Sequence, residues 1–86
     1  MLSTHNTRTQ IAAAASEAIK GLYPNLVNLH AHTDGWGRCR IWAECHLPSG
    51  EKQRAVARGK GAATAVRNFI DRINAQPELR KAATAL

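Results

Sequence analysis

Ten consecutive residues, Arg38-Cys39-Arg40-Ile41-Trp42-Ala43-Glu44-Cys45-His46-Leu47, alternate between the two sides of an extended chain. Because successive side chains of a strand point to opposite faces, this period of two predicts a half-buried strand. Its rear is apolar, and its front is basic and carries an indole. We expect it to be the central strand of a small sheet. The rear would carry Cys39, Ile41, Ala43, Cys45 and Leu47, and the front Arg38, Arg40, Trp42, Glu44 and His46.

Two neighbouring segments, 26–32 and 51–58, alternate in the same way and predict two more strands. Turns are expected at 33–37 and 48–50, where Gly, Asp, Pro and Ser favour chain reversal. The segment 59–61, Gly-Lys-Gly, is expected to break the third strand. The side chains predicted to face the core are Val27, Leu29, Ala31, Gln53, Ala55 and Ala57.

A helix is predicted before the first strand. Thr7 and Gln10 have the spacing of a capping box, so the helix is expected to begin there and residues 1–6 to fray. Gly21, followed by Pro24, is expected to end it. The apolar stripe predicted to pack on the sheet comprises Ile11, Ala14, Ala15, Ala18, Ile19 and Leu22.

A second helix is predicted after residue 61, and a short third helix at Pro77-Glu78, because Pro suits the first position of a helix. The resulting fold class is α+β. We expect the order α-β-β-β-α with a three-stranded antiparallel sheet, helices on one face and a short C-terminal helix, in one domain over residues 1–86. The second helix would bury Ala62, Ala65, Val66, Phe69, Ile70 and Ile73.

The charge balance favours an acidic partner. Twelve Lys and Arg against six Asp and Glu give a formal net charge of +6 over 86 residues. By charge alone, nucleic acid is the first expectation, and an acidic protein surface or a membrane surface is the second. Residues 1–20 lack a signal-peptide pattern, and no apolar run approaches the roughly 20 residues of a membrane span. Two cysteines are too few for a secreted disulfide framework, so we expect a reduced, cytoplasmic protein without a membrane partner.

The polar front of the sheet is the candidate binding surface. Phosphates are bound by clustered Lys and Arg, and bases or sugars by a flat aromatic ring or guanidinium between those contacts. Alternatively, a sheet with one wet face needs polar residues there for solubility alone. The loop Trp36-Gly37-Arg38 either approaches a partner closely or folds its Trp over the sheet edge. The candidate contact residues are Trp36, Arg38, Arg40, Trp42, Lys52, Arg54, Arg58 and Lys60.

Metal binding and catalysis are not expected. Cys39 and Cys45 would lie roughly 20 Å apart on a continuous strand, too far to share a zinc ion. Both face the apolar side, whereas the histidines face the wet side, so no nucleophile–base pair is predicted either. Lys60 between two glycines lacks the remaining residues of a phosphate loop. We therefore expect neither an enzyme nor a cofactor.

Residues 26–73 resemble the three-stranded-sheet-plus-helix DNA-binding domains of APETALA-type transcription factors and of integrase arm-type domains. The matching segments are Trp36-Gly37-Arg38, Ala43-Glu44 and Ala62-Ala63-Thr64-Ala65. The resemblance implies a sheet front in the major groove, with contacts from Trp36, Arg38, Arg40, Trp42 and Arg54. The chain departs from that family in its longer spacing from Trp36 to Glu44, in lacking a Gly-x-Phe before the helix and in carrying Arg67 near a usual Asp.

Two other families share features with this chain. The element order is similar to that of double-stranded-RNA-binding domains, although their lysine signature is absent where this chain reads Ala62-Ala63-Thr64-Ala65-Val66. In size and layout the chain also resembles small α+β anti-CRISPR proteins of phages. The sequence thus predicts a nucleic-acid-binding protein of phage or mobile-element type, with duplex DNA favoured. The alternative is a phage-encoded inhibitor of a host defence system, which would bind an acidic host protein or occupy a site meant for nucleic acid. Self-association as a homodimer through an outer strand is a third expectation.

Overall fold

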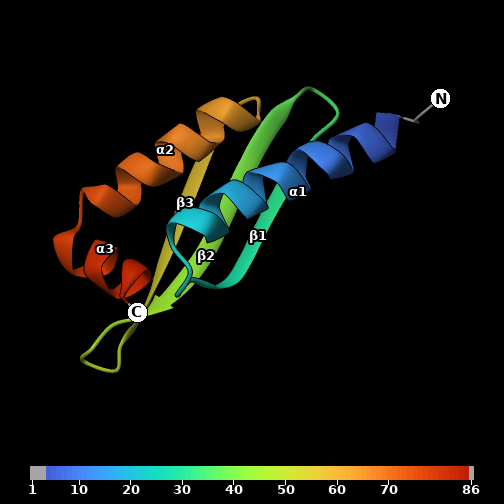
Figure 1. Ribbon diagram of the computed structural model, residues 1–86. Helices are drawn as coiled ribbons and strands as arrows, with labels where there is room; N and C mark the ends of the chain where they lie inside the picture. The colour runs from blue at the N-terminus through green and yellow to red at the C-terminus, as the bar shows by residue number, and fades with distance from the viewer. Residues whose placement is uncertain (1–3, 86) are drawn as a thin grey trace.

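The computed structural model describes residues 4–85, with side chains from residue 8 onward. The elements follow the predicted order along the chain (Figure 1). The strands form one antiparallel sheet in the order β1-β2-β3, which confirms the predicted α+β fold with β2 at its centre. The bounds are α1 Thr4–Leu22, β1 Val27–Thr33, β2 Arg38–His46, β3 Lys52–Lys60, α2 Ala62–Asn74 and α3 Pro77–Thr84.

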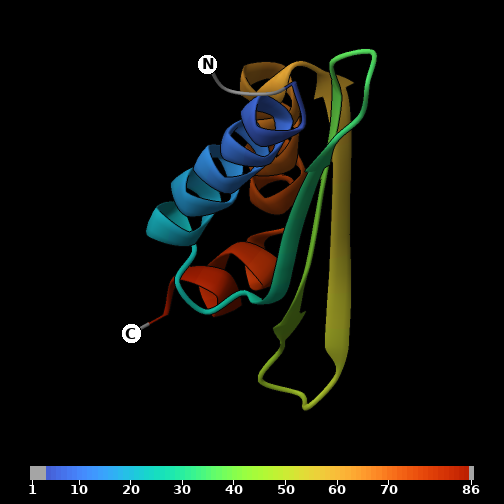
Figure 2. The same cartoon turned by 90° about the vertical axis from the view of Figure 1, so that its right-hand side faces the viewer.

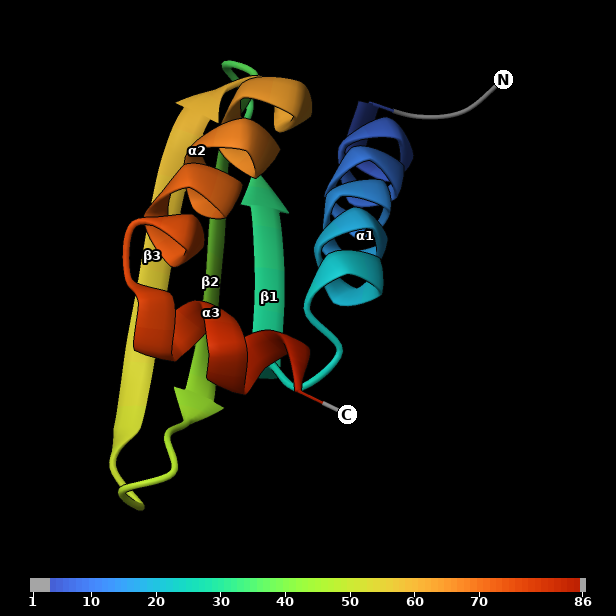
Figure 3. The same cartoon turned by 60° about the vertical axis from the view of Figure 1, so that its left-hand side comes forward.

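All three helices lie on the same face of the sheet, and the opposite face is uncovered (Figure 2). α1 lies beside β1, whereas α2 and α3 lie over the other strands (Figure 3). The rear of β2 faces this helical layer, and none of Cys39, Ile41, Ala43 and Cys45 is more than 1% exposed. Burial raises the pKa of the Cys45 thiol, which is free and packed in the core. The predicted apolar rear of β2 is therefore the centre of the core.

The second and third helices agree with the pattern in the sequence. α2 buries Ala65, Phe69 and Ile73, and α3 has Pro77 in its first turn. The segment before β1 is tied to α3, because the backbone N–H of Asn25 donates to the carbonyl oxygen of Ala83 at 3.0 Å.

The ends of α1 differ from the prediction. The helix begins at Thr4, so Thr7 lies within it and is not its N-cap, and residues 4–6 are helical rather than frayed. The expectation for residues 1–3 falls outside the described part of the chain. Gly21 is helical and does not end α1, which continues to Leu22. Beyond the helix, the Lys20 ammonium donates to the carbonyl oxygens of Pro24 at 2.9 Å and Leu26 at 3.1 Å, which holds the segment between α1 and β1 against the end of the helix.

The face of α1 that packs on the sheet is narrower than the predicted stripe. Ala15 and Ile19 are buried, and Tyr23 and Leu26 continue this surface beyond the helix. The other members of the stripe are exposed, Ile11 by 37% and Leu22 by 51%, with Ala14 and Ala18 between them. Because α1 lies beside β1 rather than over the centre of the sheet, only one side of its broad apolar surface is covered.

The third strand is longer than predicted. Gly59 does not break it, and β3 continues through Lys60. A Cβ atom on Gly59 would lie 2.7 Å from the backbone nitrogen of Ala65, so glycine is required here for close approach of β3 to α2. The chain turns at Gly61, whose φ of 82° lies in the left-handed region that suits glycine.

The outer strand β1 is irregular near its start. The pairing with β2 shifts between Val27 and His30, and Asn28 there has φ 53°. The predicted alternation nevertheless holds, since Asn28, His30 and His32 are exposed on the uncovered face. Leu26 is buried just before the strand begins.

Candidate functional site

The uncovered face of the sheet, here called the front face, is arranged in rows by the strand register. Seven of the eight predicted contact residues lie on it, and Trp36 lies in the turn between β1 and β2. His30 pairs with Trp42, and His32 with Arg40, across from β1. From the β1–β2 turn to the opposite end, the pairs between β2 and β3 are Arg38–Lys60, Arg40–Arg58, Trp42–Val56, Glu44–Arg54 and His46–Lys52.

The end of the front face nearest the β2–β3 turn contains the acidic residue Glu44. The Glu44 carboxylate accepts a hydrogen bond from the Asn28 amide at 2.9 Å and lies 3.4 Å from the Lys52 ammonium. The hydrogen bond from Asn28 lowers the pKa of Glu44 most, and Lys52 lowers it further. Together they outweigh partial desolvation, which raises it, so the pKa of Glu44 lies below its usual range. Lys52 and Arg54 thus face a carboxylate that remains ionised, which weakens their attraction for an added anion.

The centre of the front face is occupied by Trp42. Its ring stacks on His30, with centroids 5.5 Å apart, and the Arg40 guanidinium carbon lies 4.4 Å from the indole centroid. This distance is within the range of a cation–π interaction. Trp42 is half-buried and already in contact with two neighbours. The indole therefore positions the Arg40 side chain, whose charge has no ion pair with an acidic residue among residues 8–85.

The β1–β2 turn is organised by Asp34. One carboxylate oxygen accepts hydrogen bonds from the backbone N–H groups of Trp36 and Arg38, both at 2.9 Å, and the other lies 3.2 Å from Nε of Arg38. Partial desolvation raises the pKa of Asp34. The two backbone hydrogen bonds and the charge of Arg38 together outweigh it, so the pKa lies below its ordinary value. Arg38 is thus neutralised locally, and the turn has a fixed geometry.

Protonation of Asp34 is expected to loosen this turn at low pH. Because the folded-state pKa is depressed, the stabilisation is present above the unfolded-state value of about 4 and is lost as the pH falls through the folded-state pKa. NMR titration of the Trp36 and Arg38 amides should show a transition with a midpoint below about 4. The Asp34→Asn variant should lack it. A midpoint above the ordinary aspartate value would contradict the geometry of the turn.

Trp36 is the most exposed large hydrophobic side chain among the described residues, at 83%. The Arg38 guanidinium carbon lies 5.8 Å from its ring. Beside it, the carbonyl oxygen of Gly37 accepts a hydrogen bond from the N–H of Gly61 at 2.8 Å. This bond ties the turn to the end of β3 and the start of α2. Trp36 therefore projects from an anchored turn with its ring available to a partner, rather than folding over the sheet edge.

A hollow of about 570 Å³ lies at this end of the front face, and we call it the turn-end hollow. Arg40, Arg58 and Lys60 on its walls form no ion pair with an acidic side chain in the described part of the chain. The Asn68 amide of α2 donates to the carbonyl oxygen of Arg58 at 2.8 Å and holds the outer strand in place. The polar side chains lining the hollow are His32, Asp34, Arg38, Arg40, Arg58 and Lys60.

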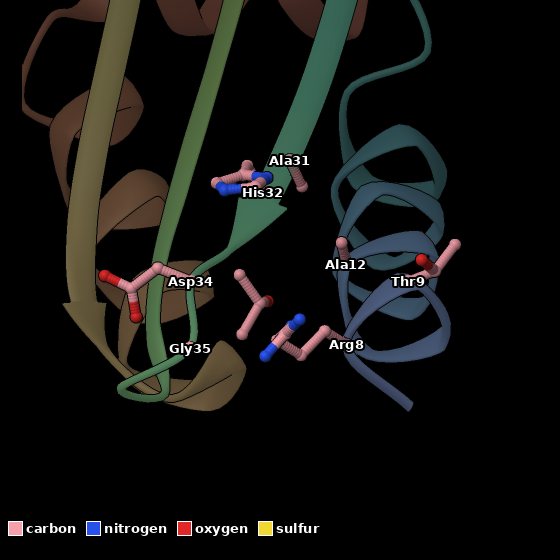
Figure 4. Close-up of a pocket in the computed structure, with 8 residues that line it drawn as sticks. Arg8, Thr9, Ala12, Ala31, His32, Asp34 and Gly35 are labelled. Carbon is pink, nitrogen blue, oxygen red and sulfur yellow. The ribbon is translucent and has the colours of Figure 1, made fainter. Parts of the chain in front are cut away.

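A second hollow, of about 330 Å³, separates α1 from the end of β1. Figure 4 shows the Arg8 side chain reaching from α1 toward Gly35, while the Asp34 side chain points away from α1. The Thr33 hydroxyl is buried beside this hollow and has no hydrogen-bond partner among the described residues. Arg8 thus adds a further cation next to the β1–β2 turn.

The chain matches no protein-family model, no curated protein and no solved structure. No group of three or more His, Cys, Asp or Glu side chains among the described residues could hold a metal ion. Likewise, no helix within residues 4–85 has the length and apolar character to cross a membrane.

Sequence reasoning missed several residues that shape this surface. The sequence pattern predicts only a turn at Asp34, whereas in the structure this residue forms an ion pair with Arg38, four positions later. The roles of Asn28 and Asn68 depend on the strand register and the packing of α2, and no local pattern indicates them. Arg8 comes near the turn only because α1 lies beside β1.

Proposed function

We propose that this protein binds nucleic acid through the front face of its sheet, with duplex DNA as the favoured ligand, and that it serves a phage or mobile element. The observation that carries the proposal is the basic character of a sheet face with no helix over it. Six cations from β2 and β3 project from this face: Arg38, Arg40, Lys52, Arg54, Arg58 and Lys60. Among the described residues, only Arg38 and Lys52 have an ion-pair partner.

The shape of this face supports the same proposal. A ribbon of two or three strands fits the major groove of DNA, and sheet-based proteins use exposed strands in this way. Here the helices stabilise the sheet from behind and leave its front unobstructed. Lys and Arg on such a face neutralise phosphates and release their counterions on binding.

Binding to a short DNA duplex should therefore weaken steeply as salt is added. If about four phosphates are contacted, the affinity should fall roughly 100-fold between about 50 and 200 mM salt. Fluorescence anisotropy with a labelled duplex measures this dependence. The absence of binding at low salt to both duplex and single-stranded DNA would refute the proposal.

A matched pair of double variants locates the binding surface. Arg54→Gln with Arg58→Gln removes two charges from the front face. Arg67→Gln with Lys81→Gln removes two from α2 and α3, on the helical side. The first variant should bind more weakly and show a shallower salt dependence, and the second should resemble the parent protein. Equal losses in both variants would indicate attraction by net charge alone.

The exposure of Trp36 beside Arg38 favours a second candidate function, the inhibition of a host defence system by binding an acidic protein. Exposed Trp and Arg residues are typical of protein interaction hot spots. A stoichiometric partner that survives nuclease treatment of the lysate, and is lost in Trp36→Ala, would favour this function. A partner released by nuclease would favour nucleic acid.

A further inference from the structure

The cations of the front face are distributed unevenly along the sheet. At the β1–β2 turn end, two like-charged pairs face each other across β2 and β3, Arg38 with Lys60 and Arg40 with Arg58. Like charges directly opposite each other destabilise a sheet unless an anion lies between them. At the other end, the carboxylate of Glu44 occupies the corresponding position between Asn28, Lys52 and Arg54. At the turn end the Asp34 carboxylate is already paired with Arg38, so Arg40, Arg58 and Lys60 are left without an acidic partner in the described part of the chain.

The start of α2 adds to the positive potential near this end. The helix has no acidic residue in its first turn, and Gly61 at its N-cap offers no side-chain acceptor. Lys60 directly precedes this N-cap residue, although a positive charge is unfavourable at the N-terminus of a helix. An anion held by Lys60 would relieve this repulsion.

The turn-end hollow has room for such an anion together with an attached group. Its volume of about 570 Å³ lies within the range of small-molecule sites. Arg38 lies both on its wall and 5.8 Å from the ring of Trp36, so the exposed indole stands close to the hollow. Aromatic side chains next to a phosphate-binding groove stack on bases whatever their sequence.

We infer that the turn-end hollow is a phosphate site, in which Arg40, Arg58 and Lys60 bind the phosphate and Trp36 stacks on the attached nucleoside. This inference rests on the proposed function, because it assigns one nucleotide of the ligand to one end of the front face. Trp42 has a different role, since its contacts with His30 and Arg40 hold the Arg40 guanidinium in place. The phosphate is either a terminal monoester or an internal diester of the strand.

Small probes test the site independently of duplex binding. Inorganic phosphate should shift the NMR amide signals of residues 58–61, and thymidine 5′-monophosphate should also shift the indole signal of Trp36. Arg40→Gln and Lys60→Gln should each weaken nucleotide binding roughly tenfold, the loss expected for one charge-assisted hydrogen bond. Lys81→Gln, on α3 behind the sheet, is the matched control and should have little effect.

Short single-stranded DNAs with and without a 5′-phosphate distinguish a terminal phosphate monoester from an internal diester as the bound group. Tighter binding of the phosphorylated strand identifies a terminal monoester, and equal binding identifies an internal diester. The inference is overturned if phosphate shifts spread evenly to Lys52 and Arg54, or if no shifts occur. If the duplex still binds in that case, the proposed function stands without the site. If the mononucleotide binds but neither single-stranded nor duplex DNA binds, the phosphate site stands and the proposed function fails.

Discussion

Replacing Ile19 with alanine is expected to destabilise the protein by about 2–5 kcal/mol, the range for removing most of a buried isoleucine side chain. Ile19 is fully buried at the contact between α1 and the sheet. A small domain is stable by only about 5–15 kcal/mol, so this loss would leave a markedly less stable protein. Chemical denaturation followed by circular dichroism measures the change.

The same substitution at Ile11 is the matched control, since it changes the same residue type in the same helix. Ile11 is 37% exposed, and its replacement should cost less than about 1 kcal/mol. The difference between the two variants reports which side of α1 is packed. Equal destabilisation by both variants would show that α1 packs through the broader stripe that the sequence alone indicates.

Gly59→Ala is expected to destabilise the protein by about 1–3 kcal/mol or more, because the added methyl group has no space. It would lie 2.7 Å from the backbone nitrogen of Ala65 and 2.8 Å from Cγ2 of Thr64. Backbone atoms cannot move aside as a flexible side chain can, so β3 and α2 must separate. That shift would also displace Arg58 and Lys60, and nucleic-acid binding should fall together with stability.

Gly21→Ala provides the control for this experiment. Gly21 lies within α1, and a methyl group there would meet nothing within 4 Å. Alanine should therefore raise the free energy of unfolding, by up to about 1 kcal/mol. If Gly59→Ala is as stable as the parent protein, the close contact between β3 and α2 described above is wrong.

The strands could be predicted from the sequence because each has one solvent-exposed face and one buried face. Polar and apolar residues therefore alternate along each strand with a period of two. The face of α1 could not be predicted in the same way. Residues 11–15 are all apolar, so several stripes fit, and the choice depends on how α1 sits beside β1. Gly59 and Gly61 likewise look equivalent in sequence. Only the fold assigns close approach to the first and a left-handed turn to the second.

The candidate surface was predictable in its members but not in its internal organisation. Alternation alone places Arg40, Trp42 and Arg58 on the front face. Whether a given cation has an acidic partner depends largely on the register, which brings β3, with Arg54 opposite Glu44, close enough for Lys52 to pair with Glu44, and leaves Arg40 opposite Arg58. The division of the face into a neutralised end and a cationic end is therefore a property of the pairing.

The hydrogen bond from the Gly61 amide to the Gly37 carbonyl connects two segments that are 24 positions apart in the chain. Its proton can exchange with solvent only when the two segments separate. The rate of deuterium uptake at the Gly61 amide would therefore report how often the β1–β2 turn, which carries Trp36, separates from the start of α2. Slower uptake in the presence of a ligand would mean that the ligand holds the turn in place. This measurement needs no label on the protein.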